Sequence, residues 1–316
     1  MQTLLNIGVD VSKAKIDICG HESGATLCLP NTRARLEQWL VGLPAGSRIA
    51  MEASGEYHEL LAELAHAKGL EVFVLNPRAI RHYAHSLGLR AKTDRVDARV
   101  IARYLAKEHA QLHRFKPLTS EQRELLQLIR HRAKLTGMRQ AAQASFKGMA
   151  GLQRHLKALV TSLDQFTRAI DKHLAGLIGA CAQRRQAAQA LRGIDGVGPL
   201  VSAALLSSLE RIEFASADAF VAYHGMDTRV DDSGKRSGRR RLSKRGPGEM
   251  RRLLFNAAMA AIKTKTWRPI YERHLKRGWP PTAALMIIGR RILRTAWSIY
   301  KHNTTFDPAR LTKGLT

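Results

Sequence analysis

Four carboxylates in the first hundred residues stand where a metal-dependent reaction would need them. Asp10 follows one short apolar run and Glu52 follows another, while Asp94 and Asp97 stand three residues apart at the start of a helical pattern. Residues three apart face the same side of a helix. Oxygen ligands of this kind suit Mg²⁺, as one ion or two, in phosphoryl transfer. Taken singly, each acid has a structural alternative, as a turn residue or a helix cap.

A second candidate lies between Asp227 and Arg252, where Ser233-Gly234 and Ser237-Gly238 stand inside a dense run of Arg and Lys. A hydroxyl beside a glycine, surrounded by cations, suits attack on a phosphodiester, because the cations hold phosphate oxygens and stabilise transition-state charge. The alternative is a solvated basic loop that binds a nucleic-acid backbone without chemistry. The candidate nucleic-acid-binding residues of this stretch are Lys235, Arg236, Arg239, Arg240, Arg241, Lys244 and Arg245.

The elements that must position the carboxylates follow from the apolar pattern of the first hundred residues. Strands are expected at 4–9, 15–20, 25–29, 47–51 and 71–75, and helices at 31–43, 57–68, 77–86 and 94–106. This is the order of a ribonuclease-H-like α/β sheet, with three antiparallel strands and two added parallel ones. Asp10 and Glu52 then end neighbouring central strands, where acids are unfavourable unless they are paired or bound to metal.

A long helical region follows, and Thr119 and Gln122 fit a capping box at its start. From Leu152 to Leu177, apolar residues recur at spacings of three and four, close to a coiled-coil heptad. Glycines at 148 and 151 leave one long helix and a helical hairpin as alternatives. The same stripe serves either a subunit-joining arm or a hairpin that packs on its own chain.

The last third of the chain is expected to be mostly α-helical. Gly196 and Gly198 precede a helix in a turn that looks like a helix-hairpin-helix, which binds phosphate through free backbone N–H groups. The alternative is a turn in which the glycines merely relieve crowding. Further helices are expected at 217–223, 248–263, 267–276 and 281–302, with a loose tail from about 304.

The charge distribution indicates a polyanionic partner. The 316 residues carry a net charge of +26, with 16 basic and 12 acidic residues in 1–117 but 36 and 14 in 118–316. Nucleic acid is the expected partner rather than a membrane surface. The sequence has no apolar run of membrane-spanning length, no secretory signal and no Cys-x-x-Cys pair among its three cysteines. We therefore expect a cytoplasmic protein without a disulfide framework or structural zinc.

The sequence resembles the DEDD transposases of bacterial insertion sequences, the family that includes the Piv-type DNA invertases. The front of the chain carries the resemblance in segments 8–13, 51–55 and 92–99 around the four acids. The back carries it in Ser233-Gly234, Ser243-Lys244-Arg245-Gly246 and Arg251-Arg252-Leu253. We expect a RuvC-like DEDD metal-binding domain at 1–117, a helical coiled-coil linker at 118–185 and a C-terminal transposase domain at 186–316.

The resemblance implies that Asp10, Glu52, Asp94 and Asp97 bind Mg²⁺ and that Ser233 is the nucleophile of a DNA transposase. It also implies a structured bridge RNA that pairs with donor and target DNA, and a coiled coil that helps a homo-oligomer, dimer or tetramer, to assemble. Two rival hypotheses remain. The first is a metal-dependent Holliday-junction-type nuclease in which the serine only binds phosphate, and the second is a non-enzymatic nucleic-acid-binding protein.

One local departure from the family pattern stands in the basic stretch. Asp227-Thr228 replaces the usual x-Pro after the Gly-Leu position. In addition, Asp231 and Asp232 place negative charge beside the expected phosphate site, and the sequence offers no account of them.

Overall fold

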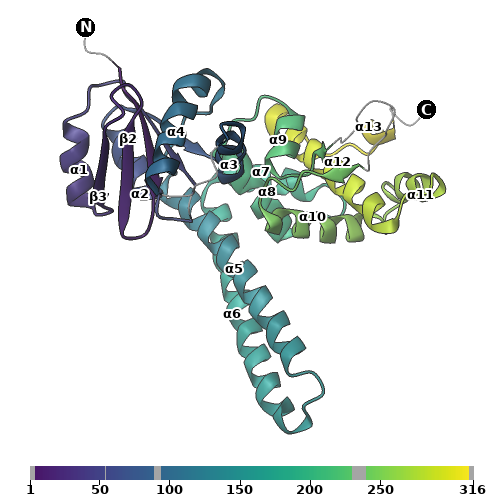
Figure 1. The fold of residues 1–316 in the computed structure, drawn as a ribbon. Coiled ribbons are helices and arrows are strands. Elements are labelled where there is room, and N and C mark those ends of the chain that lie inside the picture. The colour runs from purple at the N-terminus through teal and green to yellow at the C-terminus, as the bar shows by residue number, and fades with distance from the viewer. Residues whose placement is uncertain (1–3, 54, 89–93, 230–239, 313–316) are drawn as a thin grey trace. The chain divides into compact units, whose positions relative to one another are not determined.

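The structure, a computed structural model, describes residues 4–53, 55–88, 94–229 and 240–312, without the side chains of residues 94–96 and Thr312. The chain divides into two compact units, Met1–Pro117 and Leu118–Thr316 (Figure 1). The division into three segments stays a prediction, because the helical region and the C-terminal part fall in the same unit.

The first unit is built on a mixed five-stranded sheet with the strand order β3-β2-β1-β4-β5. The pairs β1–β2 and β2–β3 are antiparallel, whereas β1–β4 and β4–β5 are parallel. This confirms the ribonuclease-H-like arrangement expected from the sequence. The strands are β1 (Asn6–Val11), β2 (Lys15–Gly20), β3 (Thr26–Pro30), β4 (Arg48–Glu52) and β5 (Glu71–Leu75).

Helices cover both faces of this sheet. One face packs its β-branched residues against Leu36, Leu40 and Leu61 of α1 and α2. The other face, which includes Ala50, Phe73 and Leu75, packs against α4, which contacts β1, β2 and β4. The helices of this unit are α1 (Arg33–Val41), α2 (Glu59–Ala67), α3 (Pro77–Ser86) and α4 (Asp94–Glu108), followed by the short 3-10 helix η1 (His109–Gln111).

The second unit begins with a helical hairpin made of α5 (Ser120–Ser145) and α6 (Gln153–Ala180), joined through η2 (Ala150–Leu152). The two helices lie side by side, and their connection is far from α7–α12 (Figure 1). The capping box at Thr119 is present, and ion pairs such as Arg132–Asp171, at 2.6 Å, join the helices. The region is therefore a hairpin rather than one long helix.

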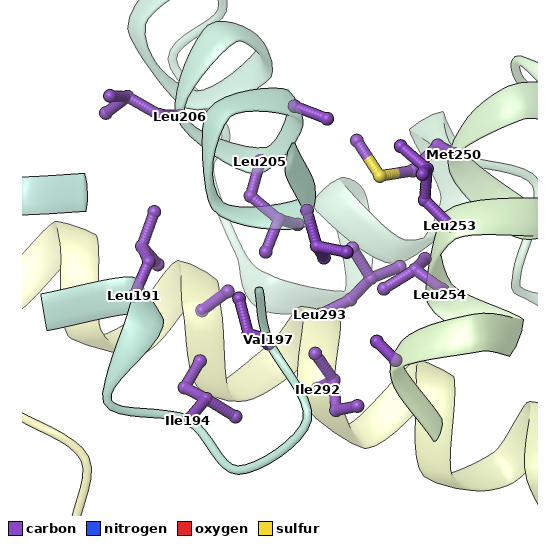
Figure 2. Close-up of a cluster of buried hydrophobic side chains, with 14 of the residues drawn as sticks. Leu191, Ile194, Val197, Leu205, Leu206, Met250, Leu253, Leu254, Ile292 and Leu293 are labelled. Carbon is purple, nitrogen blue, oxygen red and sulfur yellow. The ribbon is translucent and has the colours of Figure 1, made fainter. Parts of the chain in front are cut away.

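The rest of the second unit surrounds one hydrophobic core. Figure 2 shows side chains from the turn before α8 meeting those of α8, α10 and α12 in that core. Ile170 and Leu174 of α6 join it, which ties the base of the hairpin to the other helices. The helices are α7 (Ala182–Arg192), α8 (Pro199–Arg211), α9 (Ala217–Tyr223), α10 (Gly248–Ala261), α11 (Arg268–Lys276), α12 (Pro281–His302) and α13 (Ala309–Thr312).

The segment after α12 is packed, so the expectation of a loose tail from about residue 304 is wrong for its first part. The Phe306 ring stacks on fully buried Trp267, with ring centroids 6.3 Å apart and planes within 3°. α13 follows directly. Within the described residues, no helix is both long enough and apolar enough to span a bilayer.

Candidate active site

Asp10 and Glu52 lie beside each other at one edge of the sheet. Val9 of β1 is paired with Met51 of β4 in the parallel register, so the two acids are the next residues on neighbouring strands. Their backbones are about 5 Å apart, the usual strand spacing, and their side chains share one face. Both residues are half-buried. The fold thus brings two of the four predicted acids together.

Helix α4 lies directly on this face at Gly8. A Cβ at Gly8 would clash with the backbone of Ala98 and Ala102, so only glycine allows so close an approach between helix and strand. Asp97 immediately precedes Ala98, and Asp94 begins the helix. The acidic first turn of α4 is therefore held close to the sheet by small residues further along the helix.

The direction of α4 places its first turn at the acidic edge. Arg103, near the other end of the helix, lines a small cavity with Gly20 and His21. Gly20 is paired with Ile7, at the start of β1. Because α4 runs toward the start of β1, its N-terminal turn points toward the end of that strand, where Asp10 lies.

The donor set at this edge fits a hard cation. Among the described side chains, no group of three or more His, Cys, Asp and Glu residues is arranged to hold a metal ion. Asp10, Glu52 and Asp97 are described and do not form such a group by themselves, and the side chain of Asp94 lies outside the description. Asp10, Glu52 and Asp97 offer only carboxylate oxygens, the ligands that Mg²⁺ prefers. The complete tetrad stays a prediction.

A fifth carboxylate, which the sequence analysis did not single out, lies opposite Asp10. Asp17 of β2 is the cross-strand partner of Asp10 and is only 6% exposed. Lys15 on the same strand forms an ion pair with it, with Nζ 3.1 Å from Oδ2. The available signal was an aspartate between two isoleucines in an apolar strand, since charges are rarely buried without a partner.

The basic stretch is anchored by a short hairpin that was not expected from the sequence. β6 (Thr228–Arg229) pairs antiparallel with β7 (Arg241–Leu242). Ser233, Ser237, Lys235, Arg236, Arg239, Asp231 and Asp232 lie outside the described residues, in 230–239. What the structure describes is the hairpin on either side of the segment that carries Ser233.

Two glycines close the base of this hairpin. At Gly225 (φ +64°), a Cβ would lie 2.6 Å from the backbone nitrogens of Arg245 and Gly246. A Cβ at Gly246 would in turn meet the backbone of Tyr223 and His224. The turn after α9 and the chain before α10 therefore cross with no room for side chains, and we call this contact the glycine crossing.

Arg251 reinforces the glycine crossing from α10. Its Nη1 donates to the carbonyl oxygens of Gly246, at 2.6 Å, and His224, at 3.2 Å. Arg240, Arg241, Lys244 and Arg245 are exposed around the same base. The basic run thus contains one arginine that holds the backbone and several exposed cations.

The departure at Asp227 has a structural role. Its carboxylate accepts a hydrogen bond from the Ser243 hydroxyl, and its carbonyl oxygen accepts one from the Ser243 N–H at 3.0 Å. The Ser243 oxygen also accepts from the Arg245 N–H at 3.4 Å. Asp227 therefore ties the incoming chain of the loop to the outgoing one, and Ser243 is engaged in that contact.

A further group of cations lies on α11 and α12, where the sequence analysis proposed none. Burial, and then the neighbouring charges of Arg273 and Arg294, lower the pKa of Arg291. Arg290 precedes Arg291 on α12. Cations that disfavour each other's charge make a place where an anion is stabilised. In the sequence this group is hidden within an ordinary amphipathic helix.

The two glycines proposed to bind phosphate differ in their surroundings. At Gly196 (φ +88°), a Cβ would clash with the backbone of Ala257 and Ala261 in α10, so packing alone requires glycine there. Figure 2 shows Val197 of this turn within the core. Gly198 is the N-cap of α8, and no atom stands within 4 Å of its Cβ position. Phosphate binding at this turn stays a prediction.

His224, beside the glycine crossing, is a buried residue that sequence reasoning missed. It is 1% exposed, and neither ring nitrogen has a hydrogen-bond partner among the described residues. Burial, followed by the charges of Arg211 and Arg251, lowers the pKa of His224 to about 3. The ring is therefore neutral at pH 7.

This histidine makes stability depend on pH. Between about pH 6.5 and 3 the unfolded chain binds a proton at His224 and the folded chain does not. As the pH falls through that window, we expect the free energy of unfolding to decrease by up to about 1.4 kcal/mol per pH unit, relative to His224→Leu. Urea unfolding of both proteins at pH 7, 6, 5 and 4 measures the difference. Parallel pH profiles in the two proteins would contradict the buried neutral ring.

A ribonuclease-H-like sheet with carboxylates at the ends of its central strands, joined to a strongly basic helical unit, defines a class of enzymes that process DNA. A family model described as a transposase, of the IS110 DEDD type, matches residues 7–156. A second, described as the transposase IS116/IS110/IS902 family, matches residues 188–272. This chain belongs to the IS110 family of DEDD transposases.

Similarity to curated proteins extends over nearly the whole chain. The pilin gene-inverting protein of Moraxella bovis is 27% identical over 324 aligned residues, covering 95% of this chain and 97% of that protein. The transposase for insertion sequence element IS1328 of Yersinia enterocolitica is 23% identical, covering 97% of this chain and 100% of that protein. The two family-model matches thus lie within an alignment of full length.

Proposed function

We propose that this transposase recombines DNA through a serine nucleophile, Ser233, working with a carboxylate metal site at Asp10, Glu52, Asp94 and Asp97. The observation that supports Ser233 as the nucleophile is that the chain is held in place on both sides of it. The β6–β7 hairpin, the glycine crossing and the Asp227–Ser243 contact fix the chain on both sides of the segment that carries Ser233. Such anchoring suits a loop that must present a hydroxyl in a defined place.

The reaction keeps the phosphate as an ester throughout, because the serine ester replaces the DNA ester that is broken. The Ser233 oxygen bonds to phosphorus, its proton passes to a base or water, and the bond from phosphorus to one deoxyribose oxygen breaks. The departing oxygen takes up a proton and becomes a hydroxyl. Attack by a hydroxyl of another strand on the phosphoserine reverses these changes and restores the serine, so strands are exchanged without an external energy source.

The carboxylates would hold Mg²⁺, as one ion or two, which when bound supplies positive charge against the reacting phosphate. Support comes from the adjacent placement of Asp10 and Glu52 and from the direction of α4. The exposed Arg240, Arg241, Lys244 and Arg245 would hold the DNA backbone near the loop, with Lys235, Arg236 and Arg239 inside it. Gly196 and Gly198 would add backbone N–H groups.

We propose further that a structured guide RNA, pairing with donor and target DNA, selects the sites. The excess of 36 basic over 14 acidic residues in 118–316 supports a second polyanion besides DNA. The proposal is tested with the full-length protein, Mg²⁺ and labelled donor and target DNA, with its co-purified nucleic acid either kept or digested by ribonuclease. A covalent protein–DNA adduct that requires Ser233, and strand exchange that requires the RNA, are the expected results.

The helical hairpin supports a homo-oligomer. Leu152, Leu159 and Phe166 of the heptad stripe, seven residues apart, are 43%, 47% and 60% exposed. Other members of the same stripe, Ile170 and Leu174, are buried within the chain. A seam exposed at heptad spacing is what a second coiled coil requires. We infer that the hairpin of another copy covers it.

Charge placed on this seam should therefore dissociate the assembly. The double substitution Leu159→Glu and Phe166→Glu should shift the mass measured by light scattering to the monomer at micromolar concentration. The double substitution Thr161→Glu and Gln165→Glu is the matched control, because these exposed residues add the same two charges beside the seam but not on it. An unchanged mass for the double variant would show that the copies meet elsewhere or not at all.

A further inference from the structure

A cavity of about 300 Å³ lies between the β6–β7 hairpin and α12. Thr228, Arg240 and Leu242 line it from the hairpin side, and Trp279 and Ile287 line it from the other. Arg290 Nη1 donates to the Thr228 hydroxyl at 3.1 Å and joins the two walls. The cavity is thus built from the same hairpin that carries the Ser233 loop.

The lining combines a flat aromatic surface with cations. Trp279 is 42% exposed, a large fraction for an indole, and it faces a cavity whose other apolar residues include Met286 and Ile287. Arg240, Arg241 and Arg290 also line it, and among the residues that the structure describes no acidic side chain lines it. An exposed aromatic ring with arginines around it matches a base with its flanking phosphates.

The surroundings extend the positive charge beyond the cavity. Arg291, next to Arg290, is half-buried, and its pKa is lowered by burial and by Arg273 and Arg294. Among the described residues, Arg294 has an acidic partner in Asp218, whereas no ion pair is found for Arg291. A DNA strand leaving the cavity along α12 would therefore meet arginines whose positive charge is only partly balanced by acidic side chains.

We propose that this cavity receives one unstacked base of the DNA strand that is presented to Ser233. The inference rests on the proposed function, because it assumes that a phosphate reacts at Ser233, between β6 and β7. A volume at the lower end of the range for ligand sites suits a single ring system. Thr228 and Thr282 offer hydroxyls to the edge of the base, and Trp279 offers a face for stacking.

A base inside a regular duplex cannot enter such a cavity, because it is stacked between its neighbours. The subsite would therefore favour DNA that is single-stranded or opened beside the reacting phosphate. In this role Trp279 binds the strand next to the reaction and holds it in register, and takes no part in the bond changes themselves.

The test compares affinities of the full-length protein for short single-stranded and duplex DNA of one sequence, by fluorescence anisotropy at one salt concentration. Trp279→Ala should weaken single-strand binding about tenfold, because stacking is lost, and leave duplex binding within about twofold. Trp279→Phe should restore most of the affinity. Ala283→Leu, which fills the cavity and keeps the indole, should repeat the loss.

Met259→Ala is the matched control, since it removes another exposed apolar side chain of the same unit, on α10 and outside the cavity lining. The subsite is overturned if Trp279→Ala and Ala283→Leu both leave the affinity for single-stranded DNA unchanged. It is also overturned if these variants lose affinity equally for single-stranded and duplex DNA. A larger loss for RNA of the same sequence overturns the assignment to DNA.

The Ser233–DNA adduct, measured on the same proteins, separates this inference from the proposed function. An adduct in the wild-type protein together with unchanged single-strand affinity in the variants removes only the base subsite. A selective loss of single-strand affinity without any wild-type adduct leaves the base subsite in place and removes the serine mechanism.

Discussion

Replacing Ser233 by alanine should abolish strand exchange and the covalent protein–DNA adduct, with a rate loss of about 10³-fold or more. The magnitude follows from removing the nucleophile of a covalent mechanism. DNA affinity should change by less than about 1 kcal/mol, because a single hydroxyl contributes little to binding held by many arginines. Denaturing gels of labelled DNA measure the adduct, and the same DNA in anisotropy measures affinity.

Two neighbouring serines are natural controls for this result. Ser237→Ala should keep the adduct, because the resemblance to the family assigns the nucleophile to Ser233. Ser243→Ala removes the contact with Asp227 and should lower activity through loop placement without eliminating the adduct. Recombination by the Ser233→Ala protein would transfer the assignment to Ser237.

Neutralising either carboxylate at the end of β1 or β4 should lower DNA strand cleavage by about 100-fold or more at saturating Mg²⁺. Asp10→Asn and Glu52→Gln each keep the shape of the side chain and remove one charged carboxylate from the proposed metal site. Because both residues are only half-buried, the fold should persist. Cleavage rates over a Mg²⁺ titration, together with circular dichroism, measure the loss and confirm the fold.

The control for charge alone is Glu37→Gln, an exposed acid on α1 that pairs with Arg33. It should cleave DNA at the wild-type rate. If Asp10→Asn or Glu52→Gln also cleaves within about threefold of wild type, the acidic edge is structural. The rival hypothesis of a metal-dependent nuclease would be favoured instead if Ser233→Ala still cleaves while both carboxylate variants fail.

The first unit could be predicted almost completely from the sequence because each strand is a short apolar run and each turn carries its own signal. The position of Asp10 beside Glu52 followed from strand order alone. Asp17 was missed because a single acid in an apolar strand does not indicate which residues lie next to it in the fold. The tight fit of Gly8 against Ala98 depends on the approach of α4, which no local pattern encodes.

The second unit was harder because its patterns are ambiguous. A heptad stripe satisfies both a hairpin and an intermolecular coil, and the structure uses Ile170 and Leu174 for the former while leaving Leu159 exposed. β6 and β7 have two residues each, too few for an alternating pattern. Arg290 and Trp279 form one cavity with the hairpin only after folding, so their association was invisible in sequence order.

The glycine crossing has a consequence for how such transposases can diverge. Because Gly225 and Gly246 meet directly, the chain is fastened before Arg229 and after Arg240 regardless of what lies between them. Substitutions between these two points should therefore cost the helical core little stability. We expect sequence changes between residues 230 and 239 to alter DNA processing without unfolding the helices on either side.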